Sequence, residues 1–453
     1  MDLDRRLLML SGVAAAAPTA AAAAAAPAPG AASPFGIDAE QLGVRAYGSE
    51  DQSRALQRAI DQAAAQRLPL LLRPGIYRAA GLRLPPGAQL SGIRGATTLL
   101  LSQDLSLVES RSADGISLTG LGFDGGGRPL PEGRGLVHLL GGRGVRILDC
   151  EITGSGRNGV VLEGIEGEVR GTTITGAAGA GLLSLDARGL TIASNTVLGC
   201  GNNGIQVWRS EPGDDGTLVT GNRIEEIAAK AGGSGQNGNA INVFRAGNVI
   251  VSNNRIRGVA FTAVRGNAAS NIQILGNSCS GCGEVAIYVE FGFEGAVIAN
   301  NMVDGAALGV VVTNFNNGGR LAVVQGNVIR RLHNKRPAGT DPNDGAGIGI
   351  GVEADTAVTG NVIEDAPTAG IALGWGRHLR DVSVTGNVVR NAGVGISVSV
   401  SPGAGAAVIA DNLIADAKNG AIVAMDLKRA VGDLTREGAG RYAQLAISGN
   451  RVR

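Results

Sequence analysis

From Leu82 to the C-terminus, short aliphatic runs alternate with glycine-rich corners. Within each run, aliphatic and polar residues alternate over three to five positions, which is the pattern of a half-buried β-strand. Runs this short do not fit parallel βαβ units, which also need crossover helices. The pattern therefore predicts a solenoid, in which each coil stacks on the next.

A recurring phrase, Gly-Asn-x-aliphatic, marks one corner of each coil. It stands at 220–224, 326–329, 359–363, 385–389 and 448–452, with looser copies between them. Successive asparagines of this kind lie 23 to 38 residues apart, a period typical of repeat proteins. We interpret them as structural, because a stacked Asn side chain bonds to backbone groups and to the next Asn, and tolerates a left-handed turn. Counting from them predicts about twelve coils and a rod on the order of 55–60 Å long.

A second strand in each coil presents one face to solvent. Neighbouring side chains of a strand alternate faces, so Ile205 and Val207 point inward while Gln206 and Trp208 point outward. The same count along the chain predicts two outward rows. One row is His138, Val161, Ser184, Gln206, Asn242, Arg265, Tyr288, Val311, Gly351, Ala372 and Ser397, and the other is Leu140, Glu163, Asp186, Trp208, Phe244, Asn267, Glu290, Thr313, Glu353, Gly374 and Ser399.

One amphipathic helix is predicted, at 51–66, where apolar residues recur every three and four positions. Ser49 or Asp51 is placed to cap its start. A short strand, 70–72, and the turn 73–77 follow it. A helix here would cover the first coil, which otherwise exposes a sheet edge and an apolar core.

The first 32 residues resemble a twin-arginine export signal. Arg5 and Arg6 precede a weakly hydrophobic, alanine-rich run, and small residues follow at 30–32. The resemblance implies passage through the twin-arginine export machinery and a periplasmic or secreted location. We predict one domain, 33–453, with coils from about residue 70, and no stretch in it is long and apolar enough for a membrane span.

Composition and charge narrow the classes of function. The chain has 453 residues, of which 73 are glycine, and this fits a protein of many turns. Its formal net charge is +1 without charged blocks, so nothing favours nucleic acid as a partner. The four cysteines include one Cys-x-x-Cys pair, Cys279 and Cys282, which we interpret as buried thiols.

The helix followed by Pro-Gly-x-Tyr at 74–77, together with the Gly-Asn-x-Ile coils, carries a resemblance. The chain resembles pectate-lyase-like right-handed parallel β-helices, and within that group a family of twin-arginine-translocated repeat proteins without an assigned activity. The resemblance implies an all-β solenoid with an N-terminal capping helix. It specifies fold and hardly any chemistry.

The middle of the outward rows is the predicted binding surface. Aromatic and polar side chains gather there, and insertions flank it at 229–239 and 333–345 before the strand, and at 210–216, 314–319 and 375–380 after it. A floor of this kind between loops suits a sugar chain, because aromatic rings cover C–H faces while amides bond hydroxyls. The predicted substrate-binding residues are Trp208, Phe244, Arg245, Asn267, Asn314 and Trp375.

The predicted catalytic residues are Glu290, Tyr288, Arg265 and Glu353. In a lyase or epimerase, Arg or Tyr would act as base and acid at C5 of a uronate. Carboxylate pairs raise hydrolysis as an alternative. Glu163 and Asp186 are expected on adjacent coils at about 5 Å, and Glu290 and Glu353 two coils apart at roughly 10 Å.

Other motifs are weaker. Residues 341–344, Asp-Pro-Asn-Asp, look like the Asp-Pro-His-Asp of alginate C5-epimerases, with Asn343 in place of His. Asp214 and Asp215 are interpreted as a turn. We predict no cofactor and no metal site, with a calcium site from dispersed oxygen ligands left open.

Two functions remain open from sequence. The first is an exported protein that recognises a polysaccharide and modifies it as a lyase, epimerase or hydrolase. The second is a non-catalytic envelope or surface protein that binds a glycan or another protein through the same face.

Overall fold

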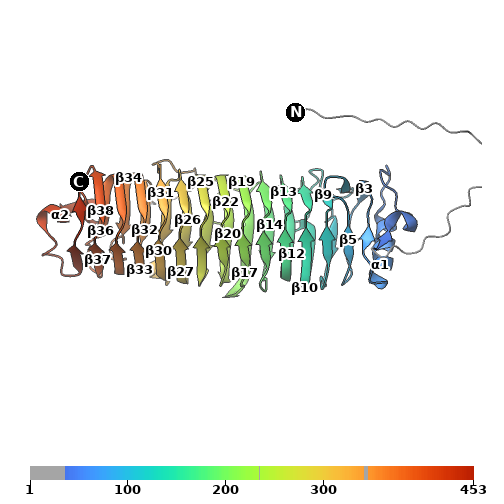
Figure 1. The fold of residues 1–453 in the computed structure, drawn as a ribbon, viewed down its shortest axis with the longest axis horizontal. Helices are drawn as coiled ribbons and strands as arrows, with labels where there is room; N and C mark the ends of the chain where they lie inside the picture. Colours follow the sequence, from blue (N-terminus) through green and yellow to red (C-terminus); the bar gives the residue numbers. More distant parts are fainter. Residues whose placement is uncertain (1–35, 234, 341–344) are drawn as a thin grey trace, which may run out of the picture.

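The computed structural model describes residues 36–233, 235–340 and 345–453. This part of the chain is a right-handed parallel β-solenoid of about 14 turns, which confirms the predicted fold class (Figure 1). The predicted export signal, residues 1–32, lies outside the described residues.

Three parallel sheets run along the rod, and each coil contributes one strand to each of them. Sheet A holds the outward rows. Its strands are β4 (Leu82–Arg83), β7 (Val108–Ser110), the first part of β10 (Gly135–Leu148) and of β12 (Asn158–Arg170), β14 (Ala180–Leu185), β17 (Asn203–Asp214), β20 (Asn239–Gly247), β23 (Val264–Asn267), β26 (Val285–Glu290), β29 (Leu308–Val312), β32 (Ile348–Val352), the last part of β34 (Val362–Leu373) and of β36 (Val388–Ser399), and β39 (Ile422–Asp426).

Sheet B precedes the asparagine corner and sheet C follows it. The strands of sheet B are β1 (Ile37–Asp38), β2 (Leu70–Leu71), β5 (Gln89–Ser91), β8 (Ser117–Thr119), the ends of β10 and β12, β15 (Thr191–Ala193), β18 (Leu218–Thr220), β21 (Ile250–Ser252), β24 (Ile272–Leu275), β27 (Glu294–Ala299), β30 (Arg320–Gln325), β33 (Ala354–Thr359), β35 (Arg380–Thr385), β37 (Ala407–Ala410) and β41 (Leu445–Ser448). Those of sheet C are β3 (Gly75–Ala79), β6 (Thr97–Leu101), β9 (Gly122–Asp124), β11 (Glu151–Thr153), β13 (Thr173–Thr175), β16 (Thr196–Leu198), β19 (Arg223–Ile227), β22 (Arg255–Val259), β25 (Ser278–Cys282), β28 (Met302–Asp304), β31 (Val328–Arg330), the starts of β34 and β36, β38 (Leu413–Ala417) and β42 (Arg451–Val452).

The estimate of about twelve coils is low. The asparagines that served as the ruler begin at Asn195, whereas β-strands already stack from Ile37 onward. Thr172 and Cys150 occupy the corner before Asn195, where their backbone N–H groups continue the same ladder. Still earlier coils carry none of the phrase, so they could not be counted from it.

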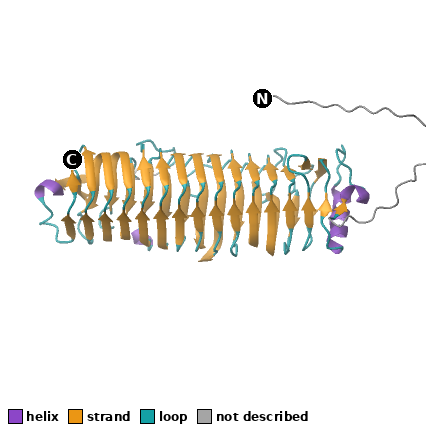
Figure 2. Cartoon of the chain, in the orientation of Figure 1, coloured by secondary structure: helices purple, strands orange, loops and turns teal. Residues whose placement is uncertain are grey.

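The two α-helices lie at opposite ends of the rod (Figure 2). The predicted cap is α1 (Ser53–Ala65), whose buried residues pack on the first coils. The N-cap is Gln52, which makes no side-chain cap hydrogen bond, so the prediction that Ser49 or Asp51 caps the helix is wrong, although the Asp51 carboxylate accepts the N–H of Ser53 at 2.9 Å. The other end carries α2 (Leu434–Glu437) and the antiparallel strand β40 (Arg429–Asp433). The remaining described elements are two short 3-10 turns, η1 (Ala39–Leu42) and η2 (Phe315–Asn317). At 13 residues, α1 is the longest helix described and is too short to cross a bilayer.

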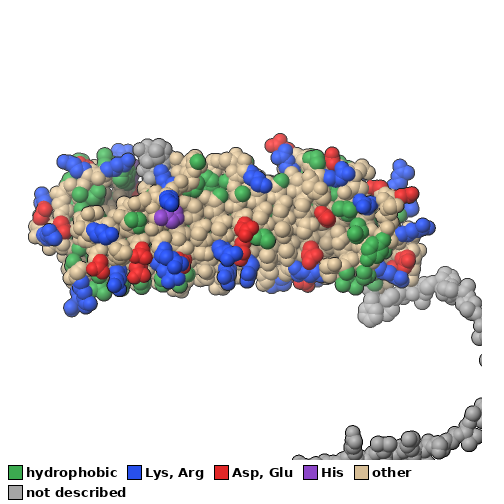
Figure 3. Space-filling view, turned by 90° about the horizontal axis from the view of Figure 1, so that it is seen from above, with side chains coloured by type: hydrophobic (Ala, Val, Ile, Leu, Met, Phe, Trp, Pro, Cys, Tyr) green, Lys and Arg blue, Asp and Glu red, His purple; other side chains and the backbone are tan. Residues whose placement is uncertain are grey.

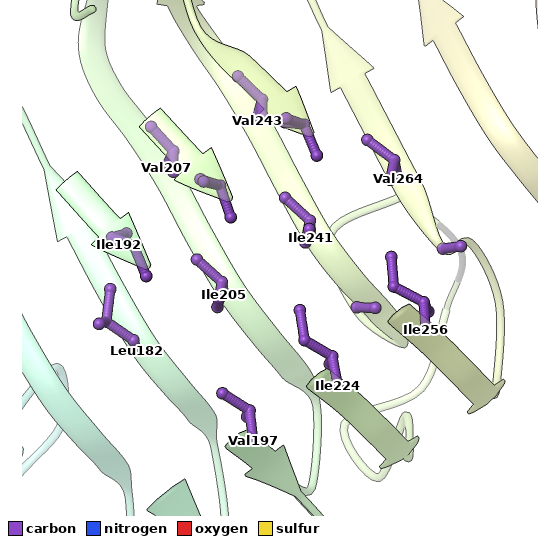
Figure 4. Packing of buried hydrophobic residues seen from close by; sticks show 14 of the residues in the cluster. Leu182, Ile192, Val197, Ile205, Val207, Ile224, Ile241, Val243, Ile256 and Val264 are labelled. Carbon is purple, nitrogen blue, oxygen red and sulfur yellow. The ribbon is translucent and has the colours of Figure 1, made fainter. Parts of the chain in front are cut away.

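Stacked aliphatic side chains fill the interior (Figure 4). The register places Ile205 against Ile241 and Val207 against Val243, and all four are fully buried. Each such side chain contributes roughly 1.5–3 kcal/mol through burial. The inward direction predicted for Ile205 and Val207 is therefore confirmed.

The asparagine ladder is the second repeating interaction. In the middle of it, Asn277 Nδ2 and its backbone N–H both donate to Asn301 Oδ1, at 3.0 and 2.9 Å. Asn301 in turn donates to Asn327 Oδ1 and, through Nδ2, to the Ile274 carbonyl. Each rung thus ties together three coils, which confirms the structural interpretation. The run of rungs is Asn195, Asn222, Asn254, Asn277, Asn301, Asn327, Asn361, Asn387, Asn412 and Asn450.

One detail of that interpretation is wrong. The left-handed residue is the one before each rung, as at Asn253 (φ 55°), Asn300 (φ 59°) and Gly326 (φ 63°). Glycine and asparagine are the residues that enter this region at least cost. This explains why the repeated phrase reads Gly-Asn or Asn-Asn.

We predict that Asn301→Ala lowers the free energy of unfolding by about 2–4 kcal/mol, because it leaves two buried donors of Asn277 without an acceptor. Urea unfolding followed by circular dichroism measures the loss. Asn450→Ala is the matched control, since that rung is partly exposed at the end of the ladder. Equal losses in the two variants would contradict the role assigned to the buried rungs.

Candidate functional site

The outward rows of sheet A follow the predicted register over the middle of the rod. The structure pairs Gln206 with Asn242 and Trp208 with Phe244, and continues from Phe244 to Asn267. The next coil pairs Asn267 with Glu290. The residues predicted to share one face there are therefore neighbours along it.

The prediction fails by one residue in the coil of β14. Glu163 lies opposite Leu185, and Ser184 points into the core, where its side chain is fully buried. Three leucines at 182, 183 and 185 leave the alternation ambiguous, and the pairing of Leu182 with Ile205 decides it. The proposed Glu163 and Asp186 pair is therefore wrong.

Both members of that pair have other partners. Asp186 accepts the backbone N–H and the hydroxyl of Ser210, at 2.8 and 2.7 Å. Glu163 lies 2.8 Å from Nε2 of His138, whose side chain is buried. Burial lowers the pKa of His138, against the opposing effect of Glu163.

Trp208 and Phe244 line a pocket of about 360 Å³ on sheet A. Their rings meet edge to face, with centroids 6.0 Å apart. Trp208 Nε1 donates to Asn242 Oδ1 at 3.4 Å, which holds the indole against the floor. The described lining consists of Trp208, Gly232, Gly233, Gly235, Gln236, Asn242, Phe244 and Asn267.

The described residues of the predicted insertion, 229–233 and 235–239, form the wall of this pocket. Asn239 Nδ2 and Asn242 Nδ2 donate to the Gly235 carbonyl at 2.8 and 3.0 Å, and Asn203 Nδ2 donates to the Gln236 carbonyl at 2.8 Å. These amides come from β17 and β20, so the rigid sheet fixes the loop from below. The wall is thereby held in place before any ligand arrives.

Gly238 closes the wall back onto the sheet. Its φ is 79°, and a Cβ atom there would lie 2.3 Å from the ring of Phe261. Both the backbone conformation and the space therefore require glycine at this position.

Arg265, Glu290 and Tyr288, three of the four predicted catalytic residues, lie together directly beyond Asn267. Arg265 Nε donates to Glu290 Oε1 at 2.7 Å, and its guanidinium carbon lies 4.8 Å from the Tyr288 ring centroid. A residue that the sequence reasoning missed, Glu284, adds a second carboxylate 3.6 Å from Arg265 Nη1. Arg265 and Glu290 are only 6% and 2% exposed, so this ion pair lies beneath the surface, while Tyr288 is half-buried.

This arrangement makes Arg265 a poor base. Burial alone would lower the pKa of its guanidinium, but the charge and hydrogen bond of Glu290, with Glu284, raise it above its ordinary value. Glu290 Oε1 also accepts from Asn267 Nδ2 at 2.9 Å. The ion pair therefore holds Asn267, and with it one side of the pocket, in a defined position.

Glu353, the fourth predicted catalytic residue, lies in a separate cluster. Glu353 lies two coils from Glu290 along sheet A. Val289 pairs with Val312 and Val312 pairs with Val352, and Glu290 and Glu353 directly follow the first and the last of these valines. Glu353 Oε2 accepts the backbone N–H of Phe315 at 2.8 Å, in η2.

Asn314 and Trp375 belong to the loops around Glu353 rather than to the pocket. Asn314 has a φ of 70° and begins the turn that covers Glu353. Trp375 is 46% exposed and forms an isolated bridge with His378, whose ring meets Phe315 edge to face. Arg245, also predicted to bind substrate, stacks over Phe244 and donates to the Ser210 carbonyl at 2.7 Å.

The predicted loop at 210–216 is mostly strand. β17 continues to Asp214, with an irregular register between Trp208 and Gly213. Asp215 is buried, and burial raises its pKa. The 341–344 motif lies outside the described residues.

A larger groove, of about 550 Å³, lies on sheet B. Aliphatic and small side chains, such as Val297, Val323 and Ala357, line most of it. Its acidic rim residue Asp355 is engaged by Arg380 at 2.8 Å. We place the candidate site in the smaller of these two, because it combines aromatic faces with amide groups in a built wall, whereas the described lining of the larger groove has no aromatic residue.

Charges and thiols of the described residues outside the pocket are dispersed or buried. Lys and Arg are interspersed with Asp and Glu on the face that Figure 3 shows, without a block of one sign. Cys150, Cys200, Cys279 and Cys282 are buried and unpaired, and burial raises the pKa of Cys200 to about 12. In the described ranges, no three His, Cys, Asp or Glu side chains are grouped to hold a metal ion.

Sequence reasoning missed the amides that build the wall. Asn203 and Asn239 face each other in the register, directly before the second strand of adjacent coils. Asn203 comes as far before Gln206 as Asn239 comes before Asn242. This equal spacing in the sequence indicates that the loop between Asn203 and Asn239 is anchored on both coils.

The match to a known protein family agrees with the observed fold. The family described as the right-handed β-helix region matches residues 108–224 and 212–389, more than half of the chain. A sequence search of curated proteins finds no match.

Solved structures of similar shape include two phage proteins. The N-terminal fragment of bacteriophage Phi29 gene product 12 has a TM-score of 0.52 at 16% identity, over 87% of this chain and 71% of that one. The Dettilon tailspike protein gp208 has a TM-score of 0.51 at 14% identity, over 86% and 68%. Likeness at these identities shows the fold alone.

We predict that Glu353→Gln gains stability relative to the unchanged protein as the pH rises from about 4 to about 8. Burial raises the pKa of Glu353 above its ordinary value of 4.5, against the opposing hydrogen bond from Phe315. A raised folded-state pKa favours folding at low pH, and this contribution is lost as the pH rises through it. Urea midpoints across the pH range measure the difference.

The exposed Glu364→Gln is the control for that experiment. It measures how a carboxyl-to-amide change on the exposed surface affects the urea midpoint over the same pH range. A flat difference for Glu353→Gln would show that burial of the Glu353 carboxyl has no energetic consequence.

Proposed function

We propose that this chain, which belongs to the right-handed β-helix family, is an exported protein that binds a polysaccharide on sheet A. The observation that carries the proposal is the pocket walled by 229–233 and 235–239, with Trp208 and Phe244 exposed to a ligand. Aromatic faces suit the C–H surface of a pyranose ring, and the surrounding amides suit its hydroxyls.

The periplasmic or secreted location rests on the Arg5 and Arg6 signal. A solenoid rod with a site on its side is suited to a polymer, because a sugar chain can run along the coils past the pocket. The twin-arginine machinery is the export partner that the signal implies.

Modification of the bound glycan is the second candidate. It is favoured by Glu353, whose raised pKa is typical of a general acid. Tyr288 and Glu290 remain proposed participants, although Glu290 is buried. Incubation with uronic-acid and neutral glycans, followed by ultraviolet absorbance and reducing-end assays, tests cleavage, and proton exchange at C5 tests epimerisation. Loss of any product formation in Glu353→Gln is the expected result if Glu353 is the acid.

We predict that Trp208→Ala weakens glycan binding at least tenfold, about 1.4 kcal/mol, because it removes one aromatic wall of the pocket. Titration calorimetry against a panel of polysaccharides measures the affinity without a tryptophan reporter. Tyr47→Ala, an aromatic 71% exposed near the N-terminal end, is the control. If no glycan binds the unchanged protein, the proposed function fails.

A further inference from the structure

The pocket is built without charge. Its described lining has two aromatic rings, three carboxamide side chains and three glycines, and no Asp, Glu, Lys or Arg. The donors and acceptors available to a ligand are therefore neutral amides and backbone groups.

The amides have capacity left for hydroxyl groups. Asn267 donates to Glu290 through Nδ2, while its Oδ1 accepts no hydrogen bond within the described part of the chain. The exposed side chain of Gln236 likewise makes none there, because its contact with Asn203 uses the backbone carbonyl. Carboxamides of this kind bond a sugar hydroxyl as donor or acceptor.

The nearest cations are already engaged. Arg265 is 6% exposed, donates through Nε to Glu290 at 2.7 Å and has Glu284 3.6 Å from Nη1, so two carboxylates balance its charge although Nη1 itself makes no hydrogen bond in the described part of the chain. Arg245 lies outside the lining, stacked over Phe244 and bonded to the Ser210 carbonyl. A ligand carboxylate in the pocket would thus compete with Glu290 and Glu284 for Arg265, and with the Ser210 carbonyl for Arg245.

An anionic sugar would moreover approach a carboxylate. Glu290 lies behind Asn267, at 2.9 Å from its amide nitrogen. Moving a ligand carboxylate out of water against aromatic rings, with no cation to pair with it, carries a large desolvation cost. A hydroxymethyl group in the same position carries no such cost.

We propose that the Trp208 pocket selects uncharged pyranose residues of a neutral polysaccharide and excludes uronates. The inference rests on the proposed polysaccharide binding and chooses between the uronic-acid and the neutral glycans of the assay proposed above. It assigns specificity to the neutral lining, with the Arg265 and Glu290 pair serving to position Asn267 rather than to bind a carboxylate.

The test compares sugars that differ only at the carboxyl. Acidic polysaccharides, among them polymannuronate, polygalacturonate and glucuronans, are titrated calorimetrically beside their carboxyl-reduced forms and natural neutral polysaccharides. We expect each ligand that binds to be neutral and to bind at least tenfold more tightly than its acidic counterpart. We also expect its affinity to change less than about twofold between about 50 and 500 mM salt, because no charge is recognised.

Gln236→Arg supplies the missing cation. This variant is expected to gain at least fivefold in affinity for the acidic partner of whichever neutral glycan binds, and Gln236→Glu is expected to show no gain. A salt-sensitive preference of the unchanged protein for acidic glycans would overturn the inference and leave polysaccharide binding intact. Absence of binding to every glycan would overturn the proposed function, and the inference with it.

Discussion

The hydrogen bond from each corner asparagine to the next is the interaction on which the rest of this structure depends. It links the coils at one corner, so that insertions elsewhere leave the stacking unchanged. The 32-residue spacing between Asn222 and Asn254 includes the pocket wall, and the 34-residue spacing between Asn327 and Asn361 includes the second insertion. Coils of different length therefore differ in their loops, while the sheet beneath them stays the same. Loops on a rigid sheet are where binding sites are usually built.

A second set of amides uses the same chemistry for another purpose. The side chains of Asn203, Asn239 and Asn242 donate to the backbone carbonyls of Gly235 and Gln236 in the wall of the pocket. They therefore fix the described wall residues on the sheet. The buried Arg265 and Glu290 pair fixes the far side of the pocket through Asn267. Both devices preorganise a binding surface, which reduces the entropy lost when a ligand binds.

Repetition made the fold predictable, and local departures from it limited the prediction of the site. Alternation identified Ile205 and Val207 as core and Trp208 as surface, because each coil repeats the same two-residue period. It failed at Ser184, where consecutive leucines satisfy either register. Alternation could not show that Glu290 is buried, because its burial depends on the neighbouring Arg265. It also could not show that Glu353 faces η2, because that contact depends on how a loop folds back.

Hydrogen exchange with a bound glycan tests whether sheet A carries the binding site at the Trp208 pocket. Amide exchange is measured by mass spectrometry on the full chain with and without saturating polysaccharide. We expect slowing to be confined to β17, β20 and the described wall residues, 229–233 and 235–239. Slowing centred on β27, β30 and β33, which line the larger groove on sheet B, would contradict it.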